Sequence, residues 1–265
     1  MPDYSFIDTH CHFDFPVFSD LKAELTKAEK AGVRKIIIPA TQQASWQNLI
    51  SLSLQHPSLY YALGLHPYFL EQHDGDALIR LDEALKHRTP RCVAVGECGL
   101  DFMLNDECLT PENIDKQYRI FDEHLQLANR YQLPLIIHAR KSHDKILQRL
   151  RKIRPNKGGV IHAFSGSYQQ AMEYVKLGFY IGVGGVITYE RAKKTRQAIA
   201  QLPLTALVLE TDAPDMPISG FQGKPNHPAY LHDIFDSLCL LRQEHKREIA
   251  HQIWHNSCVL FQLKG

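Results

Sequence analysis

The sequence predicts an α/β fold: a single (β/α)8 TIM barrel with its active site at the carboxyl ends of the strands. Eight short apolar runs recur along the 265 residues, and segments with helical periodicity separate them. Such alternation is typical of a parallel sheet with helices outside it. The polar residues that end the runs are almost all metal-ligand types, and in a barrel these groups gather at one face.

Strands are expected where β-branched and aliphatic residues cluster. The predicted ranges are Tyr4–Asp8, Lys35–Ala40, Tyr60–Leu65, Cys92–Gly96, Leu135–His138, Gly159–His162, Phe179–Val183 and Ala206–Glu210. Eight units favour closure into a barrel. A doubly wound open sheet is the alternative, and it is disfavoured because the ligand-type residues are spread over many strands instead of meeting at one switch point.

Helices are expected between the strands. Asp20 can cap a helix that ends at Gly32, and Ser167 begins another that stops at Gly178. A long apolar face with steps of three and four is formed by Ile114, Tyr118, Phe121, Leu125 and Ala128. Two further helices are predicted near Tyr230–Gln243 and Lys246–Leu260. The segments Leu100–Asn113 and Ala213–Pro228 look irregular and are expected over the mouth of the barrel.

The overall composition limits the classes of protein to which this chain can belong. The chain is 44% hydrophobic, and residues 1–265 are expected to form one domain around a large core. A formal net charge of +1 gives no support to nonspecific tracking on nucleic acid, although a local phosphate site remains compatible with it. No apolar run is long enough to span a membrane, and a monomer is the default expectation.

The N-terminal residues and the cysteines predict the cellular compartment of the protein. Residues 1–4 lack the basic and apolar regions of a signal peptide. Six cysteines show neither CxxC spacing nor a disulfide framework, so they are interpreted as reduced thiols. A cytoplasmic location is therefore expected.

A His-x-His pair ends the first run. On a strand, His10 and His12 share one face with Asp8, and Cys11 points to the other side. Cys11 is therefore interpreted as a small buried side chain rather than a ligand, as is Cys98.

Further ligand types end the later runs: Glu97, His138, His162 and Asp212. A lone histidine is often a core residue with its hydrogen bonds satisfied, but two at matching strand ends are better explained as ligands. Glu97 is interpreted as a bridging ligand or general base. Glu210 should lie deeper and orient a ligand histidine or approach the metals; the alternative is a carboxylate paired to a barrel Lys or Arg.

Six potential ligands exceed the need of one four-coordinate ion. Two divalent ions that share Glu97 and a hydroxide fit the count. Imidazoles and carboxylates suit Zn²⁺, Mn²⁺, Fe²⁺ or Co²⁺, and Mg²⁺ is also compatible. The expected cofactors are therefore two divalent metal ions per chain: Mg, Mn or Zn.

Several motifs together resemble the TatD-type deoxyribonuclease family of the amidohydrolase superfamily. They are Phe6–His12, Gly64-Leu65-His66-Pro67, Gly96–Asp101, Ile161–Gly166, Leu209–Pro214 and Asn256–Phe261. The bacterial YjjV branch of the family is resembled in particular by Phe13–Pro16, Gly182–Gly185 and Asp215–Pro217. The resemblance covers the whole chain. One departure is the segment Lys224–Pro228, which lacks the acid that this family often has there.

The resemblance implies a two-metal site and a nuclease activity. A first metal would take His10, His12, Glu97 and Asp212, and a second would take Glu97, His138 and His162, with Glu97 as the bridge. The implied reaction is hydrolysis of DNA phosphodiester bonds, of the 3′–5′ exonuclease type. DNA, single-stranded or at 3′ ends, is the expected partner.

The mechanism expected is in-line attack by a hydroxide held between the metals. Asp212 would act as general base, together with Glu97 in the catalytic set. Substrate contacts are expected from His66, Arg140, Ser165 and Lys224. Helix or loop capping is the alternative for His66, and a salt bridge at the barrel rim is the alternative for Arg140. The turn at Ser165–Ser167 opens a predicted helix, whose free N–H groups suit an anion.

Two other functions remain open. The same site would serve a metallohydrolase of a small ester, lactone or cyclic amide, and the near-zero net charge mildly favours a small substrate. A binding protein that keeps the barrel without catalysis is disfavoured, because all six ligands are present.

Overall fold

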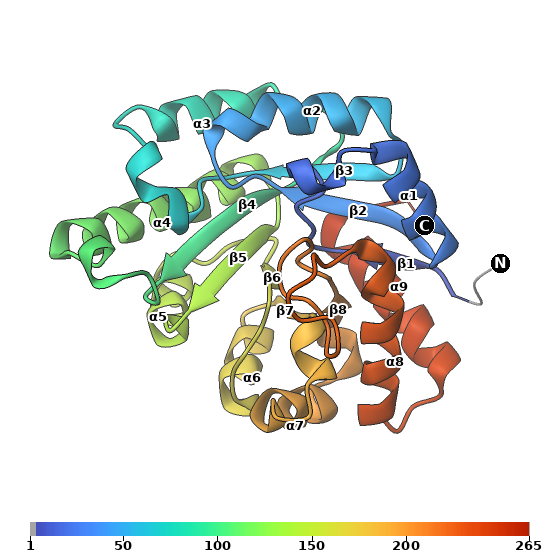
Figure 1. Ribbon diagram of the computed structural model, residues 1–265. Helices are drawn as coiled ribbons and strands as arrows, with labels where there is room; N and C mark the ends of the chain where they lie inside the picture. Colours follow the sequence, from blue (N-terminus) through green and yellow to red (C-terminus); the bar gives the residue numbers. More distant parts are fainter. Residues whose placement is uncertain (1–3, 265) are drawn as a thin grey trace.

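The computed structural model describes residues 4–264 and shows a ring of strands with helices around it (Figure 1). Residues 1–3, which bear on the signal-peptide expectation, lie outside this range. The strands are β1 Phe6–Asp8, β2 Val33–Pro39, β3 Leu59–Leu63, β4 Cys92–Asp101, β5 Leu135–Arg140, β6 Gly159–Ile161, β7 Phe179–Val183 and β8 Leu207–Leu209. All pairs are parallel and neighbours follow chain order.

Hydrogen bonds just beyond the strand ends close the barrel between β8 and β1. Thr9 N–H donates to the Leu209 carbonyl at 3.0 Å, and Asp212 N–H donates to the His10 carbonyl at 2.8 Å. The predicted (β/α)8 fold is therefore confirmed. Closure also brings Asp212 beside His10, although the two are far apart in the chain.

Nine helices lie outside the strands within the described residues. They are α1 Leu21–Lys30, α2 Trp46–Gln55, α3 Ala77–Lys86, α4 Pro111–Tyr131, α5 His143–Lys152, α6 Tyr168–Lys176, α7 Lys193–Gln201, α8 Leu231–Leu241 and α9 Lys246–Phe261. Asp20 caps α1 by accepting from Ala23 N, as predicted. Gly178 follows α6 with a φ of 85°, which suits the helix stop expected there.

Apolar side chains fill two separate layers. Inside the barrel, most strands contribute one or two small or branched side chains, and Leu260 and Phe261 of α9 join this layer. The interior members from strands are Ile7, Ile37, Ala62, Val93, Ala94, Ile136, Val160 and Val208. The larger layer packs the outer face of the strands against the helices. A barrel core of this kind is solid, so ligands must enter from its end.

Most predicted strand boundaries shift by one or two residues in the structure, β4 extends five residues further than predicted, and two of these ends bear on the site. β1 ends at Asp8, so His10 and His12 follow the strand instead of lying on it. Cys11 N–H still bonds to β2 while His12 N–H bonds to Ala213, so the alternation of sides persists. β4 runs on to Asp101, so the segment expected to be irregular from Leu100 begins as strand. Among the described residues, no helix is both long and apolar enough to cross a membrane.

Candidate metal centre

The predicted ligands meet at the carboxyl ends of the strands. His10 and His12 follow β1, Glu97 and His138 lie within β4 and β5, His162 follows β6 and Asp212 follows β8. The histidines and Glu97 are all buried. The side chain of Asp212 is 15% exposed and therefore lies at the opening to solvent.

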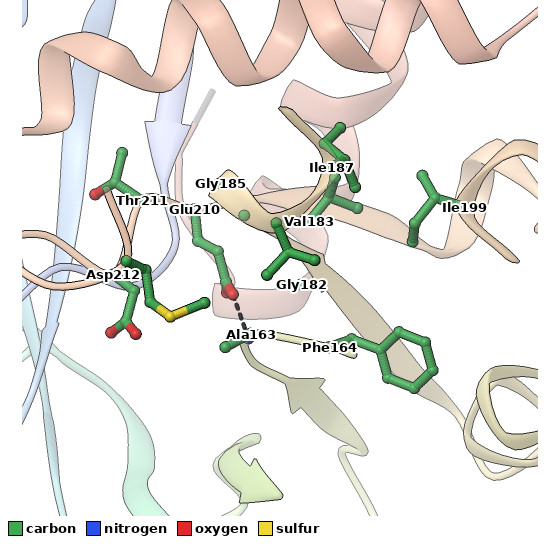
Figure 2. Close-up of a pocket in the computed structure, with 13 residues that line it drawn as sticks. Ala163, Phe164, Gly182, Val183, Gly185, Ile187, Ile199, Glu210, Thr211 and Asp212 are labelled. Carbon is green, nitrogen blue, oxygen red and sulfur yellow. Dashed lines mark hydrogen bonds between the residues drawn. The ribbon is translucent and has the colours of Figure 1, made fainter. Parts of the chain in front are cut away.

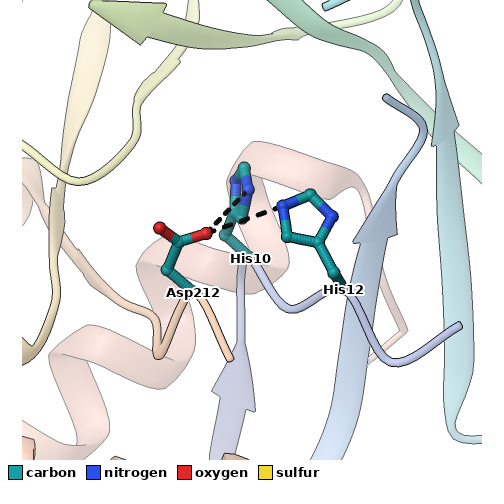
Figure 3. A group of neighbouring side chains, drawn as sticks. All are labelled: His10, His12 and Asp212. Carbon is teal, nitrogen blue, oxygen red and sulfur yellow. Dashed lines mark ion pairs between the residues drawn. The ribbon is translucent and has the colours of Figure 1, made fainter. Parts of the chain in front are cut away.

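One oxygen of Glu97 faces the first group of ligands. Glu97 Oε2 lies 3.2 Å from His10 Nε2 and 3.8 Å from His12 Nε2. Asp212 Oδ1 lies 3.4 and 3.6 Å from the same two nitrogens (Figure 3). A tetrahedral ion with bonds of about 2.0–2.1 Å requires donor atoms about 3.3 Å apart, so this spacing fits a divalent metal.

The other oxygen of Glu97 faces a second group. Glu97 Oε1 lies 2.7 Å from His162 Nε2, 3.2 Å from His138 Nδ1 and 3.1 Å from His66 Nε2. Three sets of side chains are close enough to hold an ion: His10, His12 and Asp212; His10, Glu97 and His162; and His66, Glu97 and His138. Glu97 therefore stands between two sets of donors, as a bridging carboxylate would.

The protonation states suit metal binding. Burial and the neighbouring His162 lower the pKa of His10 well below 6.5, and burial lowers the pKa of His12 to about 4. Both rings are therefore neutral, which is the form that binds metals. Both ring nitrogens of His10 are buried without a hydrogen-bond partner among the described residues. A metal ion would satisfy the orphaned lone pair at a buried nitrogen.

The pKa values of the two carboxyl groups shift in opposite directions because their neighbours differ. Burial raises the pKa of Glu97, but interactions with the neighbouring His162, His66 and His10 rings outweigh it and hold that pKa well below its usual range. Burial, together with Glu97 and other carboxylates, raises the pKa of Asp212 to about 8. A cation next to Asp212 would favour its carboxylate form.

Asp101 is a site residue that the sequence analysis missed. Its Oδ2 lies 3.0 Å from His138 Nε2, and this hydrogen bond, with Glu97, raises the pKa of His138 to about 9 against the effect of burial. A cation in the centre would favour the neutral ring, in which Nε2 donates to Asp101 and the Nδ1 lone pair faces Glu97. The available signal was spacing: Asp101 follows Glu97 by four residues on an extended strand, and therefore lies on the same side.

Asp8 and Glu210 support the centre from below. Asp8 accepts from Thr211 N at 3.0 Å and from Thr211 Oγ1 at 2.6 Å, so it ties β1 to the end of β8. Glu210 Oε1 accepts from the N–H of Ala163, the residue after His162 (Figure 2). Within residues 4–264 no Lys or Arg pairs with Glu210, which argues against the salt-bridge alternative; that Glu210 orients a ligand histidine or approaches the metals stays a prediction.

The four predicted substrate contacts lie in different settings. His66 Nδ1 accepts from Tyr68 N at 3.0 Å, so this ring caps the 3₁₀ helix at Pro67–Gln72 and also faces Glu97. Arg140 is exposed, with Nη1 3.6 Å from Asp101 Oδ2, which is the rim salt bridge named as its alternative.

Ser165 and Lys224 are both exposed. The Ser165 carbonyl lies 3.4 Å from His143 Nε2, and Lys224 Nζ lies 5.9 Å from the centre of the Phe221 ring. Among the described residues, neither side chain forms a hydrogen bond or ion pair with a proposed ligand, and both remain predictions as substrate contacts.

The closed parallel barrel and its centre of histidines and carboxylates define a metal-dependent hydrolase of the TIM-barrel class. The chain belongs to the TatD related DNase family, whose model matches residues 7–262. It is 50% identical, over 97% of both chains, to the uncharacterized metal-dependent hydrolase YjjV of Escherichia coli K12. A crystal structure of that protein superposes with a TM-score of 0.94 at 49% identity, covering 98% of each chain.

A relative with a more specific name is also similar. The chain is 32% identical to the 3′-5′ ssDNA/RNA exonuclease TatD of Erwinia tasmaniensis, over 90% of this chain and 92% of that one. Of these two relatives, the more similar one is named as a metal-dependent hydrolase, and the less similar one is named as a nuclease of single-stranded DNA and RNA.

Proposed function

We propose that this chain is a two-metal phosphodiesterase that degrades nucleic acid, most specifically a 3′–5′ deoxyribonuclease acting on single strands or 3′ ends. The observation that carries the proposal is the position of Glu97, whose two oxygens face separate donor groups. The name of the exonuclease relative supports the substrate class.

The proposed ligand sets follow the two faces of Glu97. His10, His12, Glu97 and Asp212 would hold one divalent ion, and Glu97, His138 and His162 would hold the other, with Mg, Mn or Zn as candidates. When bound, two such ions lower the pKa of water and neutralise charge on phosphoryl oxygens. Asp101 would keep His138 Nε2 protonated, so that Nδ1 stays available as a ligand.

The remaining roles are assigned by geometry. Asp212 would accept the proton of the attacking water, because its carboxyl lies beside His10 and His12 and is the most exposed of the proposed ligands. His66 would donate rather than ligate: because Nδ1 accepts from Tyr68, the neutral ring carries its proton on Nε2. Arg140 would contact a phosphate at the mouth, anchored by Asp101.

The test compares two substrates and two variants. Protein reconstituted with Mg²⁺, Mn²⁺ or Zn²⁺ is assayed on bis-p-nitrophenyl phosphate and on end-labelled single-stranded DNA. We expect Glu97→Ala to lose bound metal and activity on both. Asp212→Asn should lower kcat by about 10²–10⁴, the usual contribution of a general base. Asp115→Asn, an exposed carboxylate on α4, is the matched control.

Each part of the proposal can fail separately. If Asp212→Asn keeps its metals and stays within about threefold of wild type, Asp212 is not the base. Activity on the small diester without activity on DNA would retain the metal assignment and remove nucleic acid as substrate. Two bound metals without hydrolysis of either substrate would favour the small ester, lactone or cyclic amide.

A further inference from the structure

A surface groove adjoins the metal centre between the loops that follow β7 and β8. It has a volume of about 270 Å³ and is lined by Val186, Tyr189, Arg191, Ala192, Met216 and Pro217; we call it the β7–β8 groove. A smaller cavity, bounded by Asp212, Glu210 and Gly185, lies further inside (Figure 2). Val186 and Met216 line both spaces, so the groove lies one side chain away from the space beside Asp212.

Hydrogen bonds between the two loops form the groove in advance. The Tyr189 hydroxyl donates to the Pro217 carbonyl at 2.6 Å, and Ser219 N–H donates to Thr188 Oγ1 at 2.9 Å. A site held by such bonds loses little conformational entropy when a ligand binds. The groove is therefore a structured surface and not a gap between mobile loops.

The lining combines apolar surface with one free cation. Met216 is 38% exposed, and Pro217 and Val186 extend its apolar surface. The guanidinium of Arg191 lies 5.1 Å from the centre of the Tyr189 ring. Within residues 4–264, Arg191 has no salt bridge, and the nearby carboxylates Glu190 and Asp215 do not pair with it.

This chemistry matches one unit of a nucleic-acid strand. A nucleotide offers a flat base, which packs on apolar or aromatic side chains, and a phosphate, which arginine binds well. The net charge of the chain is only +1, so a strand must rely on local cations near the mouth. Arg191 supplies such a charge in the groove, which Val186 and Met216 separate from the space beside Asp212.

We propose that the β7–β8 groove is a nucleotide subsite, which holds the nucleotide next to the scissile bond of a single-stranded substrate. Its base would lie on Met216 and Pro217, and its phosphate would face Arg191. The inference rests on the proposed function, because it assigns the groove to the same substrate.

The experiment measures binding without turnover. A short, fluorescein-labelled phosphorothioate oligothymidylate is titrated into the full-length, metal-loaded protein at several salt concentrations. Arg191→Ala should weaken binding and reduce the slope of log K against log salt by about 0.7, the value for one phosphate contact on a single strand. Arg191→Lys should keep most of the slope, because it retains the charge.

Two further variants separate stacking from general electrostatics. Met216→Ala should lower affinity about fivefold or more and leave the salt slope unchanged, since it removes an apolar contact. Lys157→Ala removes one exposed positive charge from the loop before β6, at the opposite end of the barrel, and should change neither quantity.

The outcomes distinguish this inference from the proposed function. An unchanged slope in Arg191→Ala, or an equal loss in Lys157→Ala, would overturn the subsite even if the wild type degrades DNA. A wild type that hydrolyses no phosphodiester but binds with an Arg191-dependent slope would overturn the proposed function and support the subsite. Absence of binding by the wild type would overturn both.

Discussion

At the scale of single residues, the position of His162 depends on one buried carboxyl group, that of Glu210. Glu210 accepts from Ala163 N–H, and Ala163 has a φ of 44°, in the left-handed region that L residues seldom adopt. The carboxyl fits because residue 182 is glycine: a Cβ there would lie 2.4 Å from Glu210 Oε2. We infer that Glu210 positions His162 through the backbone that follows it.

Replacement of Glu210 by alanine should weaken metal binding about 10–100-fold, the usual cost of losing a group that orients a ligand. Glu210→Gln should stay close to wild type, because its carbonyl can still accept from Ala163. Gly182→Ala should resemble Glu210→Ala, since it displaces the same carboxyl. The measurement is calorimetric titration of the metal-free protein. If the alanine variant binds metal like wild type, Glu210 has no positioning role.

At the scale of elements, α6 begins beside the mouth with its own hydrogen bonds satisfied. Ser167 Oγ accepts from Gln170 N at 3.2 Å, and Gln170 Oε1 accepts from Ser167 N at 3.1 Å. This capping box occupies two of the N–H groups that the sequence analysis considered for an anion. The turn at Ser165–Ser167 therefore begins a helix, as predicted, and an anion site at this turn stays a prediction.

The capping box leads to a stability prediction. Ser167→Ala should lower the free energy of unfolding by about 1 kcal/mol, because Gln170 N–H loses its partner. Ser165→Ala, two residues away and exposed, should change it by less than about 0.5 kcal/mol. Urea unfolding followed by circular dichroism measures both. Equal stability of the two variants would show that the capping box contributes little.

At the scale of the whole molecule, burial of histidine between helix and barrel makes folding sensitive to acid. His124 of α4 lies near β3, with Nδ1 2.7 Å from the Ile120 carbonyl and Nε2 3.1 Å from Leu65 N. Burial lowers its pKa to about 4, against 6.5 for an ordinary histidine. Between these values the unfolded chain binds a proton that the folded chain does not.

Stability should therefore be complete above about pH 6.5 and fall as the pH drops toward 4, by up to about 1.4 kcal/mol per pH unit from this residue. His124→Gln, which can keep an acceptor for Leu65 N–H, should show a shallower fall than wild type. Urea unfolding at pH 7.5, 6 and 5 measures the difference, in which contributions from the other histidines cancel. Parallel pH profiles would rule out His124 as a source.

The sequence by itself determined the barrel, the positions of its strands and the residues that end them. These follow from local rules: runs of aliphatic residues at strands such as Leu135–His138, capping at Asp20, and a ligand-type residue after each of several apolar runs. Small errors arose at boundaries, as at Asp101, because Gly96, Glu97 and Gly99 interrupt the apolar run although the strand continues through buried Cys98 and Leu100.

Only the tertiary structure decided which of these residues contact one another. Strand register and barrel closure decide which oxygen of Glu97 faces which histidines. They also bring Asp101 to His138 and Glu210 to Ala163. The β7–β8 groove likewise exists only where two loops meet. Contacts between residues distant in the chain are set by the whole fold, so spacing along the sequence could place these groups at one end of the barrel but could not pair them.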